Sequence, residues 1–282
     1  MTVILDGKSL ADKICEQLKS ETQKLSKKPK LAVIYAGDNP ASQIYVKNKQ
    51  KKADYIGFDS VVISLPNDVT EENLLEHIYI LNEDDDVNGI LVQLPLPEGI
   101  NTQKIIEAIE PVKDCDGFTA YNFGRLALGY KPYAYPCTPK GIVKLLEHYN
   151  IKLQSSHTVV IGRSNIVGKP VSLLLQQKNS TVTMVNSYTK NLKDITKTAD
   201  ILISAAGLPN FITKEFIKNN AVIVDVGINR TEYGLTGDVD FNDCFESASF
   251  ITPVPGGIGP MTIAMLMENT LELYKIQRLF KI

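Results

Sequence analysis

Short apolar runs alternate along this chain with longer stretches in which apolar residues recur every three or four positions. The runs predict strands at residues 31–36, 61–65, 90–94, 159–161, 182–185, 201–204 and 222–226. The longer stretches predict helices at 9–26, 41–56, 70–82, 101–109, 139–149, 166–177, 213–218 and 261–279. Continuous apolar runs are typical of strands that are buried on both faces of a parallel sheet. The pattern therefore predicts an α/β fold with largely parallel sheets.

The stretch from Gly129 to Pro139 has weak periodicity and is punctuated by proline and glycine, which indicates a junction between two domains. A chain of 282 residues is long for one compact core. The last helix follows a proline-rich loop, so we expect it to return to the first domain. We predict a first domain of residues 1–138 plus 263–282 and a second of residues 139–262.

A glycine turn separates a strand from a helix in Thr158–Pro170. Gly162 would allow a sharp turn, and Gly168 would let the helix pack close to the strand. Free N–H groups at the helix N-terminus would then face a pyrophosphate, as in a Rossmann-type doubly wound sheet. The spacing differs from G-x-G-x-x-G, so a plain strand-to-helix turn is the alternative.

The end of the next strand bears on the choice of dinucleotide. Proteins that bind NAD normally place an acid there for the ribose 2′-hydroxyl, whereas this strand ends in Asn186-Ser187. Arg163 and Ser187 suit the oxygens of a 2′-phosphate. We therefore predict NADP as the cofactor, and the alternative is that Arg163 is an exposed turn residue.

The composition is that of an ordinary globular protein, with 44% hydrophobic residues, 22% charged residues and a net charge of −2. These values favour neither nucleic acid nor a membrane as partner. The absence of a signal peptide and of a long apolar run predicts a cytoplasmic location. The cysteines and histidines lack ligand spacing, so we predict no metal site, and we expect free thiols and a solvated acidic run at 83–86.

One helical face carries candidate chemistry. After Pro40, the residues Ser42, Tyr45 and Lys49 fall within about 60° of each other on a helix, so a phenol and an amine can act on one substrate. The alternative is an amphipathic helix with solvated lysines.

Gln93 ends a strand, where parallel sheets place functional side chains. Asp116, which precedes Gly117, can accept paired N–H donors of a heteroaromatic ligand or can form an Asx-turn. The loop 251–262 is rich in proline and glycine and forms either a wall around a flat ligand or a structural lid.

Six ordered motifs resemble the bifunctional methylenetetrahydrofolate dehydrogenase/methenyltetrahydrofolate cyclohydrolase family over nearly the whole chain. The motifs are Ser42–Lys49, Val92-Gln-Leu-Pro-Leu-Pro97, Lys113-Asp-Cys-Asp-Gly117, Pro136-Cys-Thr-Pro139, Gly162–Gly168 and Pro253–Thr262. The resemblance implies an active-site cleft between the two domains. It also implies NADP-dependent oxidation of 5,10-methylenetetrahydrofolate and hydrolysis of the methenyl product to 10-formyltetrahydrofolate.

The resemblance also implies residue roles. Lys49 serves the cyclohydrolase chemistry, either as a base whose pKa is lowered by burial or as a charged donor; Gln93 assists it, Tyr45 stacks on the folate and Asp116 anchors the pterin. The implied cofactor-binding residues are Gly162, Arg163, Ser164, Val167, Gly168, Ser187 and Ile228. The implied substrate-binding residues are Tyr45, Ser42, Asp116, Pro255, Gly256, Gly259 and Thr262.

Asn186 departs from the family, whose members often carry histidine there. The family implies tetrahydrofolate derivatives as partners and a homodimer joined through the nucleotide domains. Three alternatives are a dehydrogenase without cyclohydrolase activity, a silent NADP- or folate-binding module, and another two-domain NADP dehydrogenase such as shikimate dehydrogenase. The retained Tyr45, Lys49 and Gln93 argue against the first two.

Overall fold

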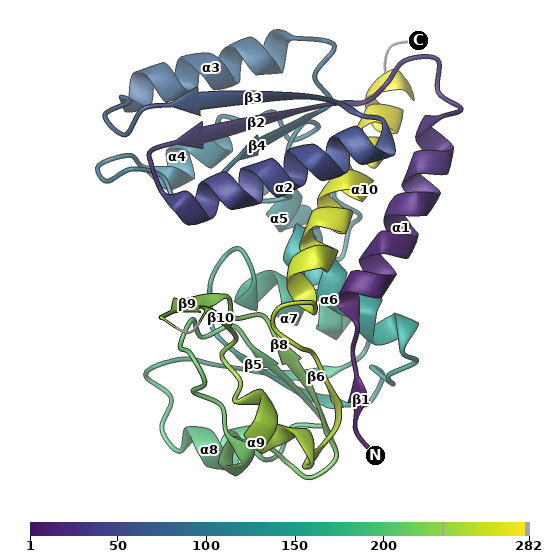
Figure 1. Cartoon of the computed structure of the whole chain (residues 1–282), viewed down its shortest axis with the longest axis vertical. Helices are drawn as coiled ribbons and strands as arrows, with labels where there is room; N and C mark the ends of the chain where they lie inside the picture. The colour runs from purple at the N-terminus through teal and green to yellow at the C-terminus, as the bar shows by residue number, and fades with distance from the viewer. Residues whose placement is uncertain (233, 280–282) are drawn as a thin grey trace. The chain divides into compact units, whose positions relative to one another are not determined.

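The computed structural model describes residues 1–232 and 234–279, and the chain divides into two compact units (Figure 1). Unit 1 consists of Met1–Asp12 and Thr138–Thr262, and unit 2 consists of Lys13–Cys137 and the segment from Ile263 on. The boundaries fall within helix α1 (Gly7–Thr22), at the start of α6 (Cys137–His148) and within α10 (Ile258–Leu279).

Unit 2 contains a parallel sheet of three strands in the order β3-β2-β4. The strands are β2 (Lys30–Ala36), β3 (Asp59–Leu65) and β4 (Gly89–Val92), and the further helices are α2 (Pro40–Ile56), α3 (Glu71–Glu83), α4 (Thr102–Glu107) and α5 (Ala120–Ala127). Helices α2 and α3 lie on opposite sides of this sheet (Figure 1). Ile34 of the central strand packs with Ile78 and Ile90, which explains why β2 is apolar at nearly every position.

Unit 1 contains a parallel sheet of six strands in the order β1-β11-β8-β7-β5-β6. The strands are β1 (Val3–Ile4), β5 (His157–Ile161), β6 (Thr181–Val185), β7 (Ile201–Ser204), β8 (Ala221–Asp225) and β11 (Ala248–Ile251). The other elements are α7 (Gly168–Gln177), α8 (Leu192–Thr196), a 3-10 turn (Lys214–Phe216), α9 (Phe241–Phe245) and the antiparallel pair β9 (Asn229–Thr231) and β10 (Gly234–Thr236). Val159, Leu202 and Ile223 lie in its core.

The order of strands in this sheet creates a switch point. The chain leaves β5 for β6 on one side and then crosses to β7 on the other side. Loops therefore diverge above the carboxyl ends of β5 and β7, the place where doubly wound sheets bind ligands. The predicted α/β class with a Rossmann-type second sheet is confirmed.

Several elements differ from the sequence prediction. The strands β1, β9, β10 and β11 and the helices α5, α8 and α9 were not predicted. Of these, β1, β9 and β10 have only two or three residues and are too short to display a period. The helix predicted at 213–218 is a single 3-10 turn. Residues 1–12 were predicted to belong to the first domain, which corresponds to unit 2. They belong to unit 1 instead, because β1 pairs with β11 and the Leu5 N–H donates to the Ile251 carbonyl (2.8 Å).

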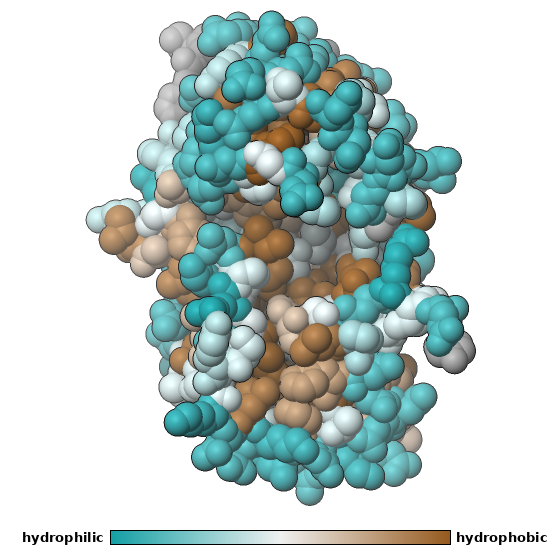
Figure 2. All heavy atoms as spheres, turned by 90° about the vertical axis from the view of Figure 1, so that its left-hand side faces the viewer, coloured by the Kyte–Doolittle hydropathy of each residue, from teal (hydrophilic) through white to brown (hydrophobic). Residues whose placement is uncertain are grey.

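The surface and the polar groups of the described chain are ordinary. On the face drawn in Figure 2, hydrophilic side chains predominate and hydrophobic ones form smaller patches. Within residues 1–232 and 234–279, no helix has the length and apolarity needed to cross a bilayer. In the acidic run, Asp84 pairs with Lys30 (3.1 Å) and Asp86 pairs with Lys27. All four cysteines are buried thiols.

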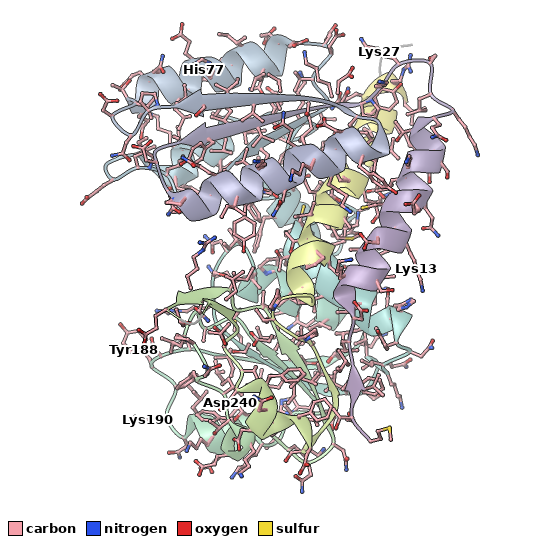
Figure 3. The ribbon with its side chains drawn as sticks, viewed as in Figure 1. Lys13, Lys27, His77, Tyr188, Lys190 and Asp240 are labelled. Carbon is pink, nitrogen blue, oxygen red and sulfur yellow. The ribbon has the colours of Figure 1, made fainter. Side chains whose placement is uncertain are left out.

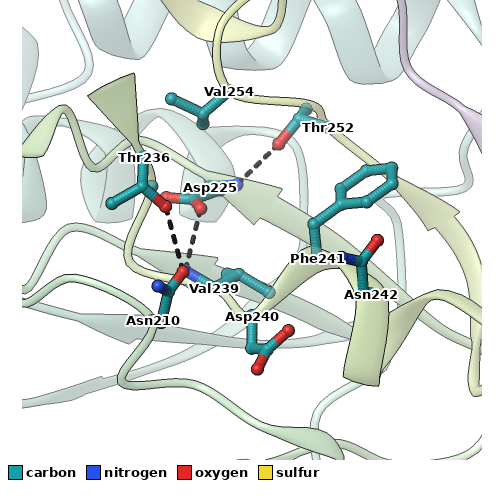
Figure 4. Close-up of a pocket in the computed structure, with 10 residues that line it drawn as sticks. Asn210, Asp225, Thr236, Val239, Asp240, Phe241, Asn242, Thr252 and Val254 are labelled. Carbon is teal, nitrogen blue, oxygen red and sulfur yellow. Dashed lines mark hydrogen bonds between the residues drawn. The ribbon is translucent and has the colours of Figure 1, made fainter. Parts of the chain in front are cut away.

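A buried carboxylate ends strand β8. Asp225 is 3% exposed, and its oxygens accept the N–H groups of Gly227, Asp238 and Val239, each at 2.9 Å. Figure 4 shows this carboxylate beside a pocket, with the Asp225 N–H donating to Thr252 Oγ1 (2.7 Å). Burial raises the pKa of Asp225 from 3.8 to about 6, and the negative charge of Asp238 adds to the rise against the effect of the three donors.

This pKa predicts how pH affects stability. The folded state binds the Asp225 proton more tightly than the unfolded state, so the contribution of Asp225 to the free energy of unfolding is lost as pH rises from about 4 to about 6. This contribution of Asp225 to the free energy of unfolding amounts to roughly 2–3 kcal/mol. We expect the free energy of unfolding of the wild type minus that of Asp225→Asn, measured with urea, to fall by this amount between pH 4 and pH 7. A difference independent of pH would contradict the prediction.

Candidate active site

Helix α2 and the end of β4 bring four predicted residues of unit 2 together. Ser42 is buried at 3% exposure, and Tyr45 and Lys49 are half-buried, while Lys47 on another face is exposed. Lys49 Nζ donates to Gln93 Oε1 at 3.0 Å, and Gln93 Nε2 donates to the Leu94 carbonyl at 2.7 Å. The second bond fixes the amide of Gln93 with its oxygen toward Lys49.

Asp116 lies in the electrostatic field of the same lysine. Its side chain is half-buried, and burial raises the pKa of the carboxyl group above its usual value. The positive charge of Lys49 lowers this pKa, the neighbouring Asp114 raises it, and a hydrogen bond with the Cys137 thiol lowers it. A partly desolvated carboxylate of this kind gains most from N–H donors that a ligand supplies.

Two charged residues that precede Asp116 hold the loop in place. Lys113 is 7% exposed, and its ammonium donates to the carbonyls at the end of α3, those of Leu81 (3.0 Å), Asn82 (2.6 Å) and Asp84 (2.8 Å). The carboxylate of Asp114 accepts the N–H groups of Gly117 and Thr119, both at 2.8 Å. Lys113 and Asp114 were not among the predicted site residues, although their place beside Asp116 in the sequence was a signal.

Asn269 of α10 also supports this loop. Its side-chain amide donates to the carbonyls of Cys115 (2.9 Å) and Tyr135 (2.8 Å). Asn269 lies far from Asp116 in the sequence, and no motif marks it. Only the return of the C-terminal segment to unit 2 brings it near the loop.

In unit 1, the glycine turn after β5 requires both of its glycines. Gly162 has a φ of +121°, and a Cβ on it would lie 2.5 Å from the Ala205 carbonyl oxygen. A Cβ on Gly168 would lie 2.2 Å from the Gly162 carbonyl oxygen. Helix α7 thus begins in direct contact with the strand end, as predicted from the spacing.

The first amides of α7 differ from the expectation that they are free. Ser164 Oγ accepts the N–H groups of Val167 (3.2 Å) and Gly168 (3.4 Å), because the hydroxyl lies one turn ahead of Val167, the N-cap residue of α7. These are long hydrogen bonds, so a stronger anionic acceptor can replace the hydroxyl.

Arg163 and Ser187 are both exposed, at the ends of the neighbouring strands β5 and β6. The Arg163 guanidinium lies 5.4 Å from the ring centre of Tyr188, which is 81% exposed and projects outward in Figure 3. Sequence analysis did not predict Tyr188. Asn186 forms the turn itself, since its Oδ1 accepts the Tyr188 N–H (3.0 Å).

Residues 251–262, which were predicted as a loop, also belong to unit 1, but only residues 252–257 form a loop, because α10 begins at Ile258. Gly256 has a φ of +110°, and its carbonyl accepts the Lys8 N–H (2.8 Å). Pro255 follows a cis peptide bond, and the hydroxyls of Thr262 and Thr138 are hydrogen-bonded at 2.9 Å. A Cβ on Gly259 would lie 3.9 Å from Ile228 Cδ1, so the structure brings these two predicted residues together.

This architecture, with a parallel sheet, a switch point and a close glycine turn, defines an α/β protein with a dinucleotide-binding unit. The chain belongs to the tetrahydrofolate dehydrogenase/cyclohydrolase family. Residues 5–116 match the model of its catalytic domain, and residues 136–278 match the model of its NAD(P)-binding domain.

Individual relatives agree over nearly the full length. The Bifunctional protein FolD of Sulfurihydrogenibium is 54% identical over 97% of this chain and 98% of its own. The crystal structure of the bifunctional enzyme FolD of Campylobacter jejuni has a TM-score of 0.96 at 47% identity and covers 98% of this chain and 99% of its own. The enzyme of Trypanosoma brucei, solved with NADP and an inhibitor, has a TM-score of 0.93 at 36% identity and covers 98% of both chains.

The glycine contacts predict opposite effects of the same substitution at two sites. In Gly168→Ala the new methyl group meets backbone, so we expect a loss of about 2–3 kcal/mol in the free energy of unfolding. Gly124 lies within α5 with no atom within 4 Å of its Cβ position, so Gly124→Ala should gain about 0.5–1 kcal/mol. Urea unfolding measures both, and a neutral Gly168→Ala would refute the close contact.

Proposed function

We propose that this chain oxidises 5,10-methylenetetrahydrofolate with NADP and hydrolyses the resulting 5,10-methenyl cation to 10-formyltetrahydrofolate. The observation that carries the proposal is the hydrogen-bonded Lys49–Gln93 pair in the field of Asp116, in a chain that contains both domains of the family. A silent binding module has no need of a lysine held in this way.

Asp116 anchors the pterin ring of the folate. A pterin offers adjacent N–H donors in one plane, and a carboxylate accepts two such donors at once. Tyr45 and Ser42 lie on the face of α2 that carries Lys49, so Tyr45 stacks on the flat ring and Ser42 supports the same surface. The proposed substrate contacts also include Pro255 and Gly256, in the loop after β11, and Gly259 and Thr262, at the start of α10.

Lys49 acts in the hydrolytic step. Its positive charge stabilises the negative form of Asp116, and Gln93 accepts one of its N–H bonds. An ammonium has three donors, so two remain to orient the attacking water and the oxygen of the carbinolamine intermediate. We therefore favour the charged-donor role over the role of a neutral base.

The residues of unit 1 fit NADP. Arg163 and Ser187 bind the 2′-phosphate, the turn Gly162–Gly168 with Ser164 and Val167 faces the pyrophosphate, and Ile228 contacts the cofactor. When bound, NADP accepts the hydride from the one-carbon bridge. That transfer needs no protein acid, because the folate nitrogens stabilise the positive charge of the product.

The assembly and the location of the chain stay predictions. We infer a cytoplasmic homodimer that acts on tetrahydrofolate derivatives, with support from the family and from a net charge of −2 that favours no polyanionic partner.

A direct assay tests the function. The chain is mixed with 5,10-methylenetetrahydrofolate and NADP, and NADPH and the methenyl chromophore are followed together, with NAD in a parallel reaction. NADPH that rises without matching methenyl accumulation, after correction for spontaneous hydrolysis, supports the coupled steps. Stoichiometric methenyl accumulation would indicate a dehydrogenase alone, and no NADPH would contradict both activities.

Removal of the lysine should separate the two activities. We expect Lys49→Ala to lower cyclohydrolase turnover by about 10²- to 10⁴-fold, the size of a general acid–base contribution, and to lower dehydrogenase turnover much less. Lys47→Ala, on an exposed face of the same helix, is the matched control and should leave both activities unchanged. Equal loss of both activities in Lys49→Ala would contradict the role given to Lys49.

Asp116→Asn should weaken folate binding selectively. The variant keeps the shape of the side chain but loses charge-assisted hydrogen bonds of roughly 1.5–3 kcal/mol, which corresponds to an increase of about 10- to 100-fold in the Kd of a folate ligand. The Kd of NADP should stay nearly the same. Calorimetric titration measures both constants, and an equal loss of both affinities would make Asp116 a structural loop residue.

A further inference from the structure

Asp238 collects donors from two loops of unit 1. Its side chain is fully buried, at 0% exposure, and directly follows the β9–β10 pair in sequence. Its carboxylate accepts the hydroxyl of Ser204 (3.1 Å), the side-chain amide of Asn229 (3.0 Å) and the consecutive N–H groups of Ala206 (2.7 Å), Gly207 (3.2 Å) and Leu208 (3.0 Å). Ser204 ends β7 and the three N–H groups belong to the loop that follows it, while Asn229 begins β9, directly after the loop that follows β8.

Asp225 extends the same network. Its Oδ1 accepts the N–H groups of Asp238 and Gly227, so the two carboxylates hold the loop after β8 from both ends of Ile228. Both neighbouring glycines are required. A Cβ on Gly227 would lie 2.2 Å from Asp238 Oδ1, and a Cβ on Gly237 would lie 1.8 Å from Asp225 Oδ2.

The energetics point away from a role in stability alone. Two carboxylates buried side by side repel each other and lose their hydration, and these costs offset part of what their hydrogen bonds to the loop N–H groups contribute to stability. What the carboxylates supply is fixed positions for backbone that belongs to no regular element. Fixed backbone of this kind is what a binding site for an extended ligand requires.

The two loops lie where one half of a dinucleotide binds. In a doubly wound sheet, the two halves of the dinucleotide bind on opposite sides of the switch point. Arg163 and Ser187, at the ends of β5 and β6, suit the phosphate of the adenosine half. The loops after β7 and β8 lie on the other side of the switch point, the side that would receive the nicotinamide half, and Ala205 lies against the glycine turn between the two sides.

We propose that Asp238, together with Asp225, is a positioning residue that holds residues 205–208 and 227–229 in the conformation that receives the nicotinamide half of NADP. This inference rests on the proposed NADP-dependent function. Neither aspartate contacts the reacting atoms, and both act through the backbone that they order.

The test compares NADP with 2′,5′-ADP, which contains only the adenosine half, by calorimetry on the full chain. In Asp238→Asn one oxygen becomes a donor that opposes the N–H groups it faced, so the Kd of NADP should rise at least about tenfold. The Kd of 2′,5′-ADP should change less than about twofold. Asn229→Ala removes a single donor and should raise the Kd of NADP about three- to tenfold. Thr236→Ala is the control, because the Thr236 hydroxyl bonds Asn210 and neither aspartate, and it should change the Kd of neither ligand.

The outcomes separate the inference from the function on which it rests. Wild type that binds NADP, together with unchanged binding in Asp238→Asn and Asn229→Ala, overturns the inference alone. Equal weakening of both ligands also overturns it, because that result indicates general destabilisation. If Asp238→Asn does not fold, the Kd values of NADP and 2′,5′-ADP for Asn229→Ala test the inference in its place. Wild type that binds neither ligand overturns the proposed function and the inference with it.

Discussion

Both units depend on satisfying the backbone polar groups of loops that leave parallel strands. Such loops have no ladder of hydrogen bonds, and a buried N–H or carbonyl without a partner is costly. In this chain, buried charged side chains supply the partners. In unit 2, Lys113 donates to carbonyls and Asp114 accepts N–H groups. In unit 1, Asp225 and Asp238 accept N–H groups.

This arrangement explains how the candidate active site keeps its geometry. Asp116 lies between Lys113 and Gly117, whose positions are fixed by the carbonyls of α3 and by Asp114. Gln93 is oriented by the Leu94 carbonyl and in turn holds Lys49. The residues proposed to touch folate are therefore supported by a second set of polar residues that carry no chemistry themselves, as a preorganised site requires.

The sequence predicted the regular elements well where the hydrophobic pattern was long. The strands β2 to β8, the long helices and the glycine turn all lie where the apolar runs and the Gly162–Gly168 spacing placed them. The strands β1, β9 and β10 were missed, since two or three residues hold no periodic signal. The 3-10 turn at Lys214–Phe216 shows the same limit, because one apolar turn does not establish a helix.

The sequence by itself determined the α/β class, the motifs of the family and the residues whose type suits the chemistry, among them Lys49, Gln93, Asp116 and Arg163. These properties depend on local pattern and side-chain chemistry, which the sequence states directly. Only the tertiary structure decided that residues 1–12 belong to unit 1 through the pairing of β1 with β11, that Asn269 reaches the Asp116 loop and that Asp238 accepts donors from the segments after β7 and β8. Such contacts join segments that are distant in the chain, and no local pattern records which donor a buried acceptor will meet.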